Sequence, residues 1–390
     1  MKIGILVWQL DIKGGTQRQA LELARFLSKS GHRIVVYAYV FDREQCYAHL
    51  CEGLSIKYVK LHKDIDKADY PITKGEYLYK YFMFFLGKKH RELLQILDAD
   101  IDILNPHDHG TYVTAGLWQK KFRKPVVWMM NDMPLYNWNL NHIPKTIGYH
   151  VRPQYRHYIS RFDEIVVLDN LNKRHVKENF HREAKVIRSG LDIEKFTFTP
   201  RPHKKDCKIL MTSVLYPHRK VEDAARALRI LVDKGYDVAI EHVGTLVRDP
   251  KYTKRILRLV DRLRLNDRFN FNGSVSEKEL TLFFQNLDVY LFPNSPQTWG
   301  LSVFEAMTAG MPVVLTSGCG ASEVLTDHEN ALITPPDSPQ ALAQAIEELI
   351  KEKGLKEKII RNARTFVEDN ISWEKYSLAM LEVFKKYAKA

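Results

Sequence analysis

The sequence predicts an α/β protein built from two Rossmann-like, doubly wound domains that face each other across a cleft. Strand-like apolar runs alternate with amphipathic helical stretches from one end of the chain to the other, a pattern typical of parallel sheets covered by helices. The 390 residues leave room for two hydrophobic cores, since a domain takes about 150 residues. Ligands bind such sheets at the carboxyl ends of the strands, so we expect the site in the cleft.

Each half of the chain supplies its own set of expected strands. Those of the first half are Lys2–Trp8, Ile34–Val40, Ser55–Leu61, Ile101–Asn105, Pro125–Met130, Glu164–Leu168 and Lys185–Arg188. Those of the second half are Lys208–Val214, Val238–Val243, Phe269–Asn272, Val289–Pro293, Pro312–Thr316 and Ala331–Thr334.

A polar segment with two prolines, Phe198–Lys205, is the expected linker, because proline holds itself and the preceding residue in extended shapes. It separates a first domain of residues 1–197 from a second of residues 205–372. The last helical stretch, residues 373–390, lies beyond the final strand pattern and is expected to pack back on the first domain.

Composition narrows the class of protein. With 45% hydrophobic and 27% charged residues the chain is expected to fold throughout. The four cysteines match neither paired zinc-ligand spacing nor a dense disulfide framework, so a reducing, cytoplasmic compartment is expected. The net charge of +12 favours an anionic partner: nucleotide phosphates, nucleic acid or an anionic membrane.

The turn after the first expected strand contains Gly14 and Gly15, followed by a helical stretch that stops at Gly31. Glycines at a helix N-terminus let backbone amides approach a phosphate or a sugar hydroxyl. A simple tight turn explains the pair equally well.

The segment Gln297–Val314 reads as a glycine-containing loop, a short helix and a buried strand. Amides near Leu301 and Ser302 would face a pyrophosphate at the helix N-terminus, and Glu305 can accept hydrogen bonds from a ribose diol. The alternative is that Ser302 and Glu305 form a capping box with no ligand.

These residues carry a resemblance to the family 4 glycosyltransferases of the GT-B fold, also described as glycosyl transferases group 1. That family's signature is a glutamate, seven residues, a second glutamate, Ala-Met, and a Gly-x-Pro-Val-Val strand, here Glu305–Val314. The resemblance covers nearly the whole chain, most strongly residues 205–350. It implies retaining transfer of a sugar from a nucleoside diphosphate sugar, with UDP or GDP expected, to an acceptor hydroxyl.

The resemblance also assigns roles to single residues. Glu305 takes the position that binds the donor ribose, and Gln297 stands where the family has its first glutamate. Asn131 stands where the family usually has a histidine close to the transferred sugar. Arg219 and Lys220 match the family's phosphate-binding arginine and lysine, although their spacing differs from the common pattern; the alternative is a solvated basic turn.

Further positions are expected around the donor and acceptor. Donor contacts are expected from the backbone of Gly244, Ser274, Val275, Gly300, Leu301 and Ser302, together with Gly14 and Gly15. After the fourth expected strand, His107, Asp108 and His109 are candidates for acceptor contact. They can also be read as metal ligands, but the resemblance implies an enzyme without metal or other cofactor.

The aromatic and basic stretch Tyr77–Arg91 has two readings. It can lie on an anionic membrane and present a lipid-linked acceptor, or it can be a buried helix, since apolar residues occupy every face. The expected partners are therefore a nucleotide sugar and a carbohydrate or lipid-linked acceptor, at the inner face of the membrane if the first reading holds.

Three rival functions follow from the same residues. A sugar-nucleotide epimerase on the same fold would need acid and base carboxylates at the sugar ring. A non-catalytic sugar-nucleotide-binding protein is suggested by the departures at Gln297 and Asn131. A nucleic-acid role rests on charge alone and lacks a supporting module.

Overall fold

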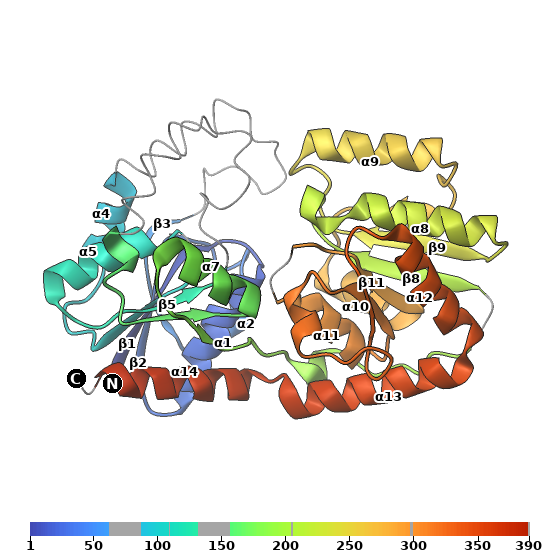
Figure 1. Cartoon of the computed structure of the whole chain (residues 1–390). Helices are drawn as coiled ribbons and strands as arrows, with labels where there is room; N and C mark the ends of the chain where they lie inside the picture. The colour runs from blue at the N-terminus through green and yellow to red at the C-terminus, as the bar shows by residue number, and fades with distance from the viewer. Residues whose placement is uncertain (62–86, 109, 132–156, 204–205, 297–298, 389–390) are drawn as a thin grey trace. The chain divides into compact units, whose positions relative to one another are not determined.

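The computed structural model describes residues 1–61, 87–108, 110–131, 157–203, 206–296 and 299–388, which form two compact units (Figure 1). Unit 1 contains the described residues up to Gly190 and the C-terminal helix that starts at Trp373. Unit 2 contains the described residues from Leu191 to Ser372. Each unit has its own sheet and its own core.

Unit 1 has a parallel sheet in which β1 lies between β2 and β4. The order is β3-β2-β1-β4, and isolated bridges from Leu104 to Val126 and from His107 to Met129 join β4 to a second group, β5-β6-β7. The strands are β1 (Lys2–Leu10), β2 (Arg33–Phe41), β3 (Ser55–Leu61), β4 (Ile103–Pro106), β5 (Val127–Met130), β6 (Glu164–Val167) and β7 (Lys185–Val186).

Helices cover this sheet and bury its apolar runs. They are α1 (Gly15–Lys29), α2 (Ala48–Cys51), α4 (Lys88–Gln95), α5 (Tyr112–Phe122), α7 (Asn170–Phe180) and α14 (Trp373–Ala388). Helix α14 packs on α1, and the Arg18 guanidinium lies 6.0 Å from the centre of the Trp373 ring. Helix α14 therefore belongs to the same unit as the N-terminal strand and helix.

Unit 2 has a single parallel sheet in the order β10-β9-β8-β11-β12-β13. Its strands are β8 (Cys207–Thr212), β9 (Val238–Val243), β10 (Phe269–Phe271), β11 (Val289–Phe292), β12 (Val313–Thr316) and β13 (Leu332–Thr334). Its α-helices are α8 (Val221–Asp233), α9 (Pro250–Arg262), α10 (Glu277–Asn286), α11 (Leu301–Thr308), α12 (Pro339–Lys351) and α13 (Lys353–Asn370).

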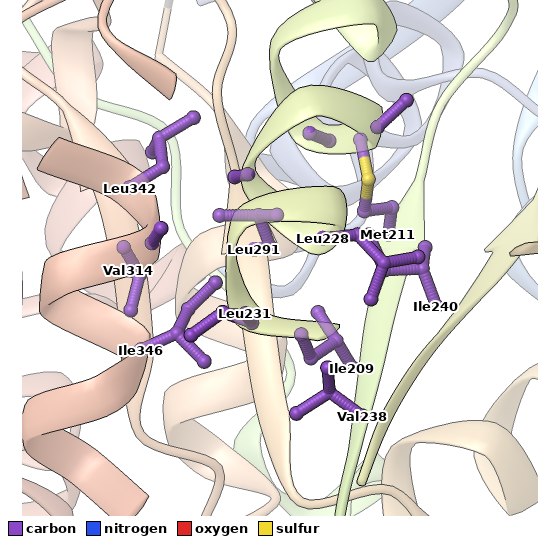
Figure 2. Packing of buried hydrophobic residues seen from close by; sticks show 14 of the residues in the cluster. Ile209, Met211, Leu228, Leu231, Val238, Ile240, Leu291, Val314, Leu342 and Ile346 are labelled. Carbon is purple, nitrogen blue, oxygen red and sulfur yellow. The ribbon is translucent and has the colours of Figure 1, made fainter. Parts of the chain in front are cut away.

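The core of unit 2 contains side chains of β8 and β11, the two central strands of its sheet. Their side chains Ile209, Met211 and Leu291 pack against Leu228 and Leu231 of α8 (Figure 2). Strands buried in this way read as continuous apolar runs in the sequence.

The observed architecture confirms the predicted α/β class with two parallel-sheet, Rossmann-like domains, and every expected strand is present within a few residues of its expected bounds. The passage between the units differs from the expected linker, because it falls at Gly190 and Leu191. Residues 198–203 belong to unit 2, where Thr199 N–H donates to Ala309 O at 3.2 Å and the Arg201 Nη1 donates to Gln285 O at 2.7 Å. The proline-bearing segment is thus fixed by hydrogen bonds.

In the described part of the chain, no helix has the length and apolar character that crossing a membrane requires. Of the aromatic stretch Tyr77–Arg91, residues 77–86 lie outside the described residues. Residues Lys88–Arg91 begin α4, which buries His90 and Leu93.

Candidate active site

The sheet of unit 2 has a topological switch point between β8 and β11. The chain leaves β8 toward β9 on one side, whereas β11 and β12 extend the sheet on the other. Loops that leave two such neighbouring strands in opposite directions open a crevice at their carboxyl ends, where ligands bind in sheets of this kind. We therefore expect a ligand site among the residues around this point.

The hydroxyl groups of Tyr290 and Thr212 join the two central strands at the switch point. They lie 2.6 Å apart, and the Tyr290 side chain is fully buried. Burial raises the pKa of Tyr290 to about 12, while hydrogen bonds with Ser302 and Thr212 act in the opposite direction. Glu305 and Arg219 both exert electrostatic effects on this hydroxyl. Tyr290 thus connects both strands to the start of α11.

Arg219 lies in the loop after β8 and is held by the loop after β11. Asn294 is 1% exposed, and its side-chain amide lies against Arg219. In the amide orientation that satisfies both residues, it accepts a hydrogen bond from Arg219 Nη1 at 2.8 Å and donates to the Arg219 carbonyl at 3.3 Å. Ser295 N–H donates to the His218 carbonyl at 2.9 Å. These bonds position a guanidinium at the switch point.

Lys220 has a different neighbour from Arg219. It takes a left-handed conformation with φ of +50° just before α8, and its ammonium group pairs with the Asp337 carboxylate. The Asp337 side chain is 64% exposed, and exposed pairs of this kind are weak. Lys220 can therefore exchange Asp337 for a phosphate at little cost.

Helix α11 begins after its N-cap residue Gly300, which makes no side-chain hydrogen bond to the helix. Gly300 has φ of +74°, and a Cβ there would lie 3.1 Å from the Phe292 ring. The capping-box alternative for Ser302 and Glu305 is wrong, because the cap position is two residues before Ser302. The first amides of α11 carry the partial positive charge of a helix N-terminus, and Ser302 and Glu305 are half-exposed beside them.

The loops after β8, β9 and β10 meet at Gly244. Its φ is +140°, and a Cβ there would lie 2.0 Å from the Ser213 carbonyl oxygen. Gly244 N–H donates to the Gly273 carbonyl at 2.8 Å, and Ser213 N–H donates to Val243 O at 2.9 Å. Beyond Gly273, Ser274 is exposed and Val275 is half-buried. This part of the rim therefore presents mainly backbone groups.

In unit 1, Gly14 and Gly15 form the entry to α1, which also lacks a side-chain cap. Gly14 is extended with φ of −121°, so its conformation does not require glycine. A Cβ on Gly14 would meet only the flexible end of Gln17, at 2.4 Å, and one on Gly15 would meet nothing within 4 Å. The pair leaves the first amides of the helix unobstructed.

Asn131 follows β5 directly and is 5% exposed. Within the described part of the chain, neither its amide nitrogen nor its amide oxygen has a hydrogen-bond partner. Buried polar groups in native proteins are nearly always bonded. The free amide of Asn131 is thus suited to a ligand hydroxyl.

His107 and Asp108 follow β4, and the two side chains have different surroundings. His107 is fully buried, with its Nε2 2.8 Å from Asn105 Oδ1, and burial lowers its pKa to about 3. Asp108 is half-exposed with φ of +64°, and its Oδ1 accepts from Gly110 N–H at 2.7 Å. His109 and Gln297 lie outside the described residues.

Among the described residues, no group of three or more histidine, cysteine, aspartate or glutamate side chains could hold a metal ion.

The two Rossmann-like parallel sheets define a protein of the GT-B fold, and comparison with known proteins extends this to a family. Residues 192–366 match the model of "Glycosyl transferases group 1", and residues 13–195 match that of "Glycosyltransferase Family 4". The chain belongs to this family, the family 4 glycosyltransferases, and is a glycosyltransferase that uses a nucleotide-sugar donor.

Similar proteins match along their whole length. An uncharacterized glycosyltransferase of Methanocaldococcus jannaschii is 23% identical, with 99% of this chain and 98% of the relative covered. The phosphatidyl-myo-inositol mannosyltransferase of Mycolicibacterium smegmatis is 22% identical, with 100% and 95% covered. The structure of Anabaena HepE in complex with UDP-glucose has a TM-score of 0.76 at 18% identity, with 99% and 100% covered, and shares the fold.

Proposed function

We propose that this enzyme transfers a sugar with retention from a nucleoside diphosphate sugar, which it binds at the switch point of unit 2, to an acceptor hydroxyl. The observation that carries the proposal is the Arg219 guanidinium, fixed by Asn294 at 2.8 Å at the same switch point as the uncapped start of α11. A fixed cation and free helix amides together form an anion site suited to a diphosphate.

Arg219, Lys220 and the amides of Gly300, Leu301 and Ser302 bind the two phosphates. The leaving diphosphate gains negative charge as the glycosidic bond breaks, and these groups stabilise that charge without a metal. Glu305, half-exposed on the first turns of α11, accepts hydrogen bonds from the ribose diol.

The base lies against the backbone rim formed by Gly244, Ser274 and Val275. UDP is the first candidate, because the similar HepE structure contains UDP-glucose, and GDP is the second. Since backbone groups form this rim, the base is recognised by the shape of the loops after β9 and β10.

Unit 1 supplies groups for the transferred sugar and the acceptor. Gly14 and Gly15 offer backbone amides, and Asn131 orients the sugar through its side-chain amide. Gln297 of unit 2 orients the sugar through its own side-chain amide. Asp108 and His109 contact the acceptor. His107, buried and bonded to Asn105 at 2.8 Å, is a positioning residue that fixes the end of β4.

The chemistry requires no protein nucleophile. The acceptor hydroxyl attacks the anomeric carbon on the face that the diphosphate leaves, and a departing phosphate oxygen takes the acceptor proton. Attack on that face preserves the anomeric configuration. Anomeric NMR signals of the first product would show inversion if this proposal is wrong.

The acceptor is a glycan or a lipid-linked sugar. One relative is named for a phosphatidyl-myo-inositol substrate, which supports a lipid-linked acceptor and a cytoplasmic enzyme located peripherally at the inner face of the membrane. The stretch Tyr77–Arg91 is the proposed membrane contact on the side of unit 1.

Thermal unfolding with a panel of UDP-, GDP-, ADP- and dTDP-sugars tests the donor site. A ligand that binds only the folded state raises the melting temperature by mass action. We expect one nucleotide to raise it in the wild type and in Glu357→Ala, an exposed site on α13, but not in Glu305→Ala. A shift that persists in Glu305→Ala would place the ribose elsewhere, and no shift with any nucleotide would contradict the proposed donor class.

A further inference from the structure

Helix α9 of unit 2 carries a row of exposed cations on one face. We call this row the α9 cationic stripe; its members are Lys251, Lys254, Arg255, Arg258 and Arg262, all exposed. Their spacing places them on one face of an α-helix, and at 1.5 Å per residue the row is about 16 Å long. The buried side chains Tyr252, Ile256 and Val260 fix the opposite face of α9 on the unit.

Most of these cations have no acidic partner. In the described part of the structure only Arg255 forms an ion pair, with Glu222 at 2.9 Å. Asp249 is used as the N-cap of α9, where it accepts from Tyr252 N–H at 3.0 Å, and Asp261 accepts from Asn266 Nδ2 at 2.9 Å. The stripe is therefore a local concentration of uncompensated positive charge.

On two other surface helices of the same unit, lysines form ion pairs with glutamates of the same helix. Lys351 lies 2.5 Å from Glu347, Lys353 lies 3.7 Å from Glu357, and each pair is four residues apart on one helix. Paired charges of this kind are typical of a helix face that meets only water. Exposure to water alone therefore does not account for the unpaired cations of α9.

Exposed apolar side chains border the stripe. Leu257 of α9 is 46% exposed, and Val247, in the loop before the helix, is 37% exposed. A helix with a basic face and neighbouring apolar side chains is suited to the interface of an anionic bilayer, where cations meet headgroups and apolar groups enter the acyl boundary. Figure 1 shows α9 beside α8, at the outer side of unit 2.

We propose that the α9 cationic stripe is a docking surface for a membrane rich in anionic phospholipid. It uses no residue of the candidate donor site, and it is a second surface besides the stretch Tyr77–Arg91. Leu257 and Val247 favour lipid over nucleic acid, because a nucleic-acid backbone offers them no apolar contact.

Vesicle flotation tests the proposal with phosphatidylcholine vesicles that contain or lack phosphatidylglycerol. The variant Lys251→Gln/Lys254→Gln/Arg258→Gln removes three cations of the stripe. Its matched control, Lys351→Gln/Lys353→Gln/Lys385→Gln, removes three cations that are ion-paired elsewhere and lowers the net charge equally. Circular dichroism and the melting temperature establish that both variants fold.

We expect the wild type and the control to bind only the anionic vesicles, and the stripe variant to partition about 100-fold less, since each basic residue near such a surface contributes about fivefold. Equal loss in both variants would show that net charge alone is responsible and would overturn the proposal. Retained binding by the stripe variant would overturn it too. Preferential binding of a duplex oligonucleotide through the stripe would assign the surface to nucleic acid instead.

Discussion

The hydroxyl groups of Tyr290 and Thr212 lie 2.6 Å apart and connect the two central strands of unit 2, at the residue that ends β8. Replacing Tyr290 with Phe removes this bond and the bond with Ser302. We expect the free energy of unfolding to fall by about 1–2 kcal/mol, because the loss leaves polar groups unpaired. Donor affinity should fall as well, since Ser302 belongs to the start of α11. Urea unfolding and nucleotide titration measure the two effects.

A matched control for that substitution is Tyr376→Phe in α14. Tyr376 is 1% exposed, and its hydroxyl has no hydrogen-bond partner among the described residues. Removing a hydroxyl that is buried and unpaired should leave stability unchanged or raise it. Equal losses in Tyr290→Phe and Tyr376→Phe would show that the bond between Tyr290 and Thr212 contributes nothing specific.

At Gly244 the backbone leaves almost no room for a side chain. A Cβ would lie 2.0 Å from the Ser213 carbonyl oxygen, and φ is +140°. We expect Gly244→Ala to move the loops after β8 and β9 apart, to cost more than about 2 kcal/mol of stability, and to abolish stabilisation by nucleotide. Melting temperatures with and without donor measure both effects.

The comparison for this substitution is Gly235→Ala, at the end of α8. Gly235 also has a positive φ, +84°, but a Cβ there would meet nothing within 4 Å. Only the backbone strain of about 1 kcal/mol should remain, and nucleotide should still stabilise the variant. If both variants respond to nucleotide like the wild type, the rim at Gly244 does not form part of the donor site.

The strands could be predicted from sequence because buried parallel strands are short apolar runs, a local property. The contacts of the site could not. Asn294 and Arg219 are separated by a long stretch of sequence and meet only because β8 and β11 are neighbours. Thr212 and Tyr290 read as ordinary strand residues, and nothing local distinguishes them from the core.

Two other differences have causes that the sequence pattern concealed. Ser302 and Glu305 have the spacing of a capping box, but the left-handed Gly300 starts the helix earlier. The segment around Arg201 has linker composition, yet the Arg201 side chain is 9% exposed and bonds to carbonyls of unit 2. A polar composition with prolines is compatible with a linker, but the hydrogen bonds of Arg201 form with residues that are distant in the sequence.

The variant Asn131→Ala is expected to lose activity while its stability stays nearly unchanged. Because the buried amide of Asn131 has no hydrogen-bond partner within the described residues, its removal should change the free energy of unfolding by less than about 1 kcal/mol. If the amide orients the donor sugar, kcat should fall at least tenfold while the stabilisation by the free nucleoside diphosphate is unchanged. Steady-state kinetics and thermal unfolding measure these quantities. Full activity in Asn131→Ala would remove this residue from the site.

The buried His107 predicts a specific dependence of stability on pH. Burial lowers its pKa from 6.5 to about 3 in the folded protein, so below pH 6.5 the unfolded chain binds a proton that the folded chain does not. The stabilisation is fully present above pH 6.5 and is lost as the pH falls from 6.5 toward 3, by up to about 1.4 kcal/mol per pH unit. We expect the stability of His107→Gln, measured by urea unfolding, to decline less steeply over this range than that of the wild type. Substitution of the exposed His203 with Gln controls for the loss of a histidine. Parallel curves for His107→Gln and the wild type would mean that His107 is protonated in the folded protein, in conflict with its burial against Asn105.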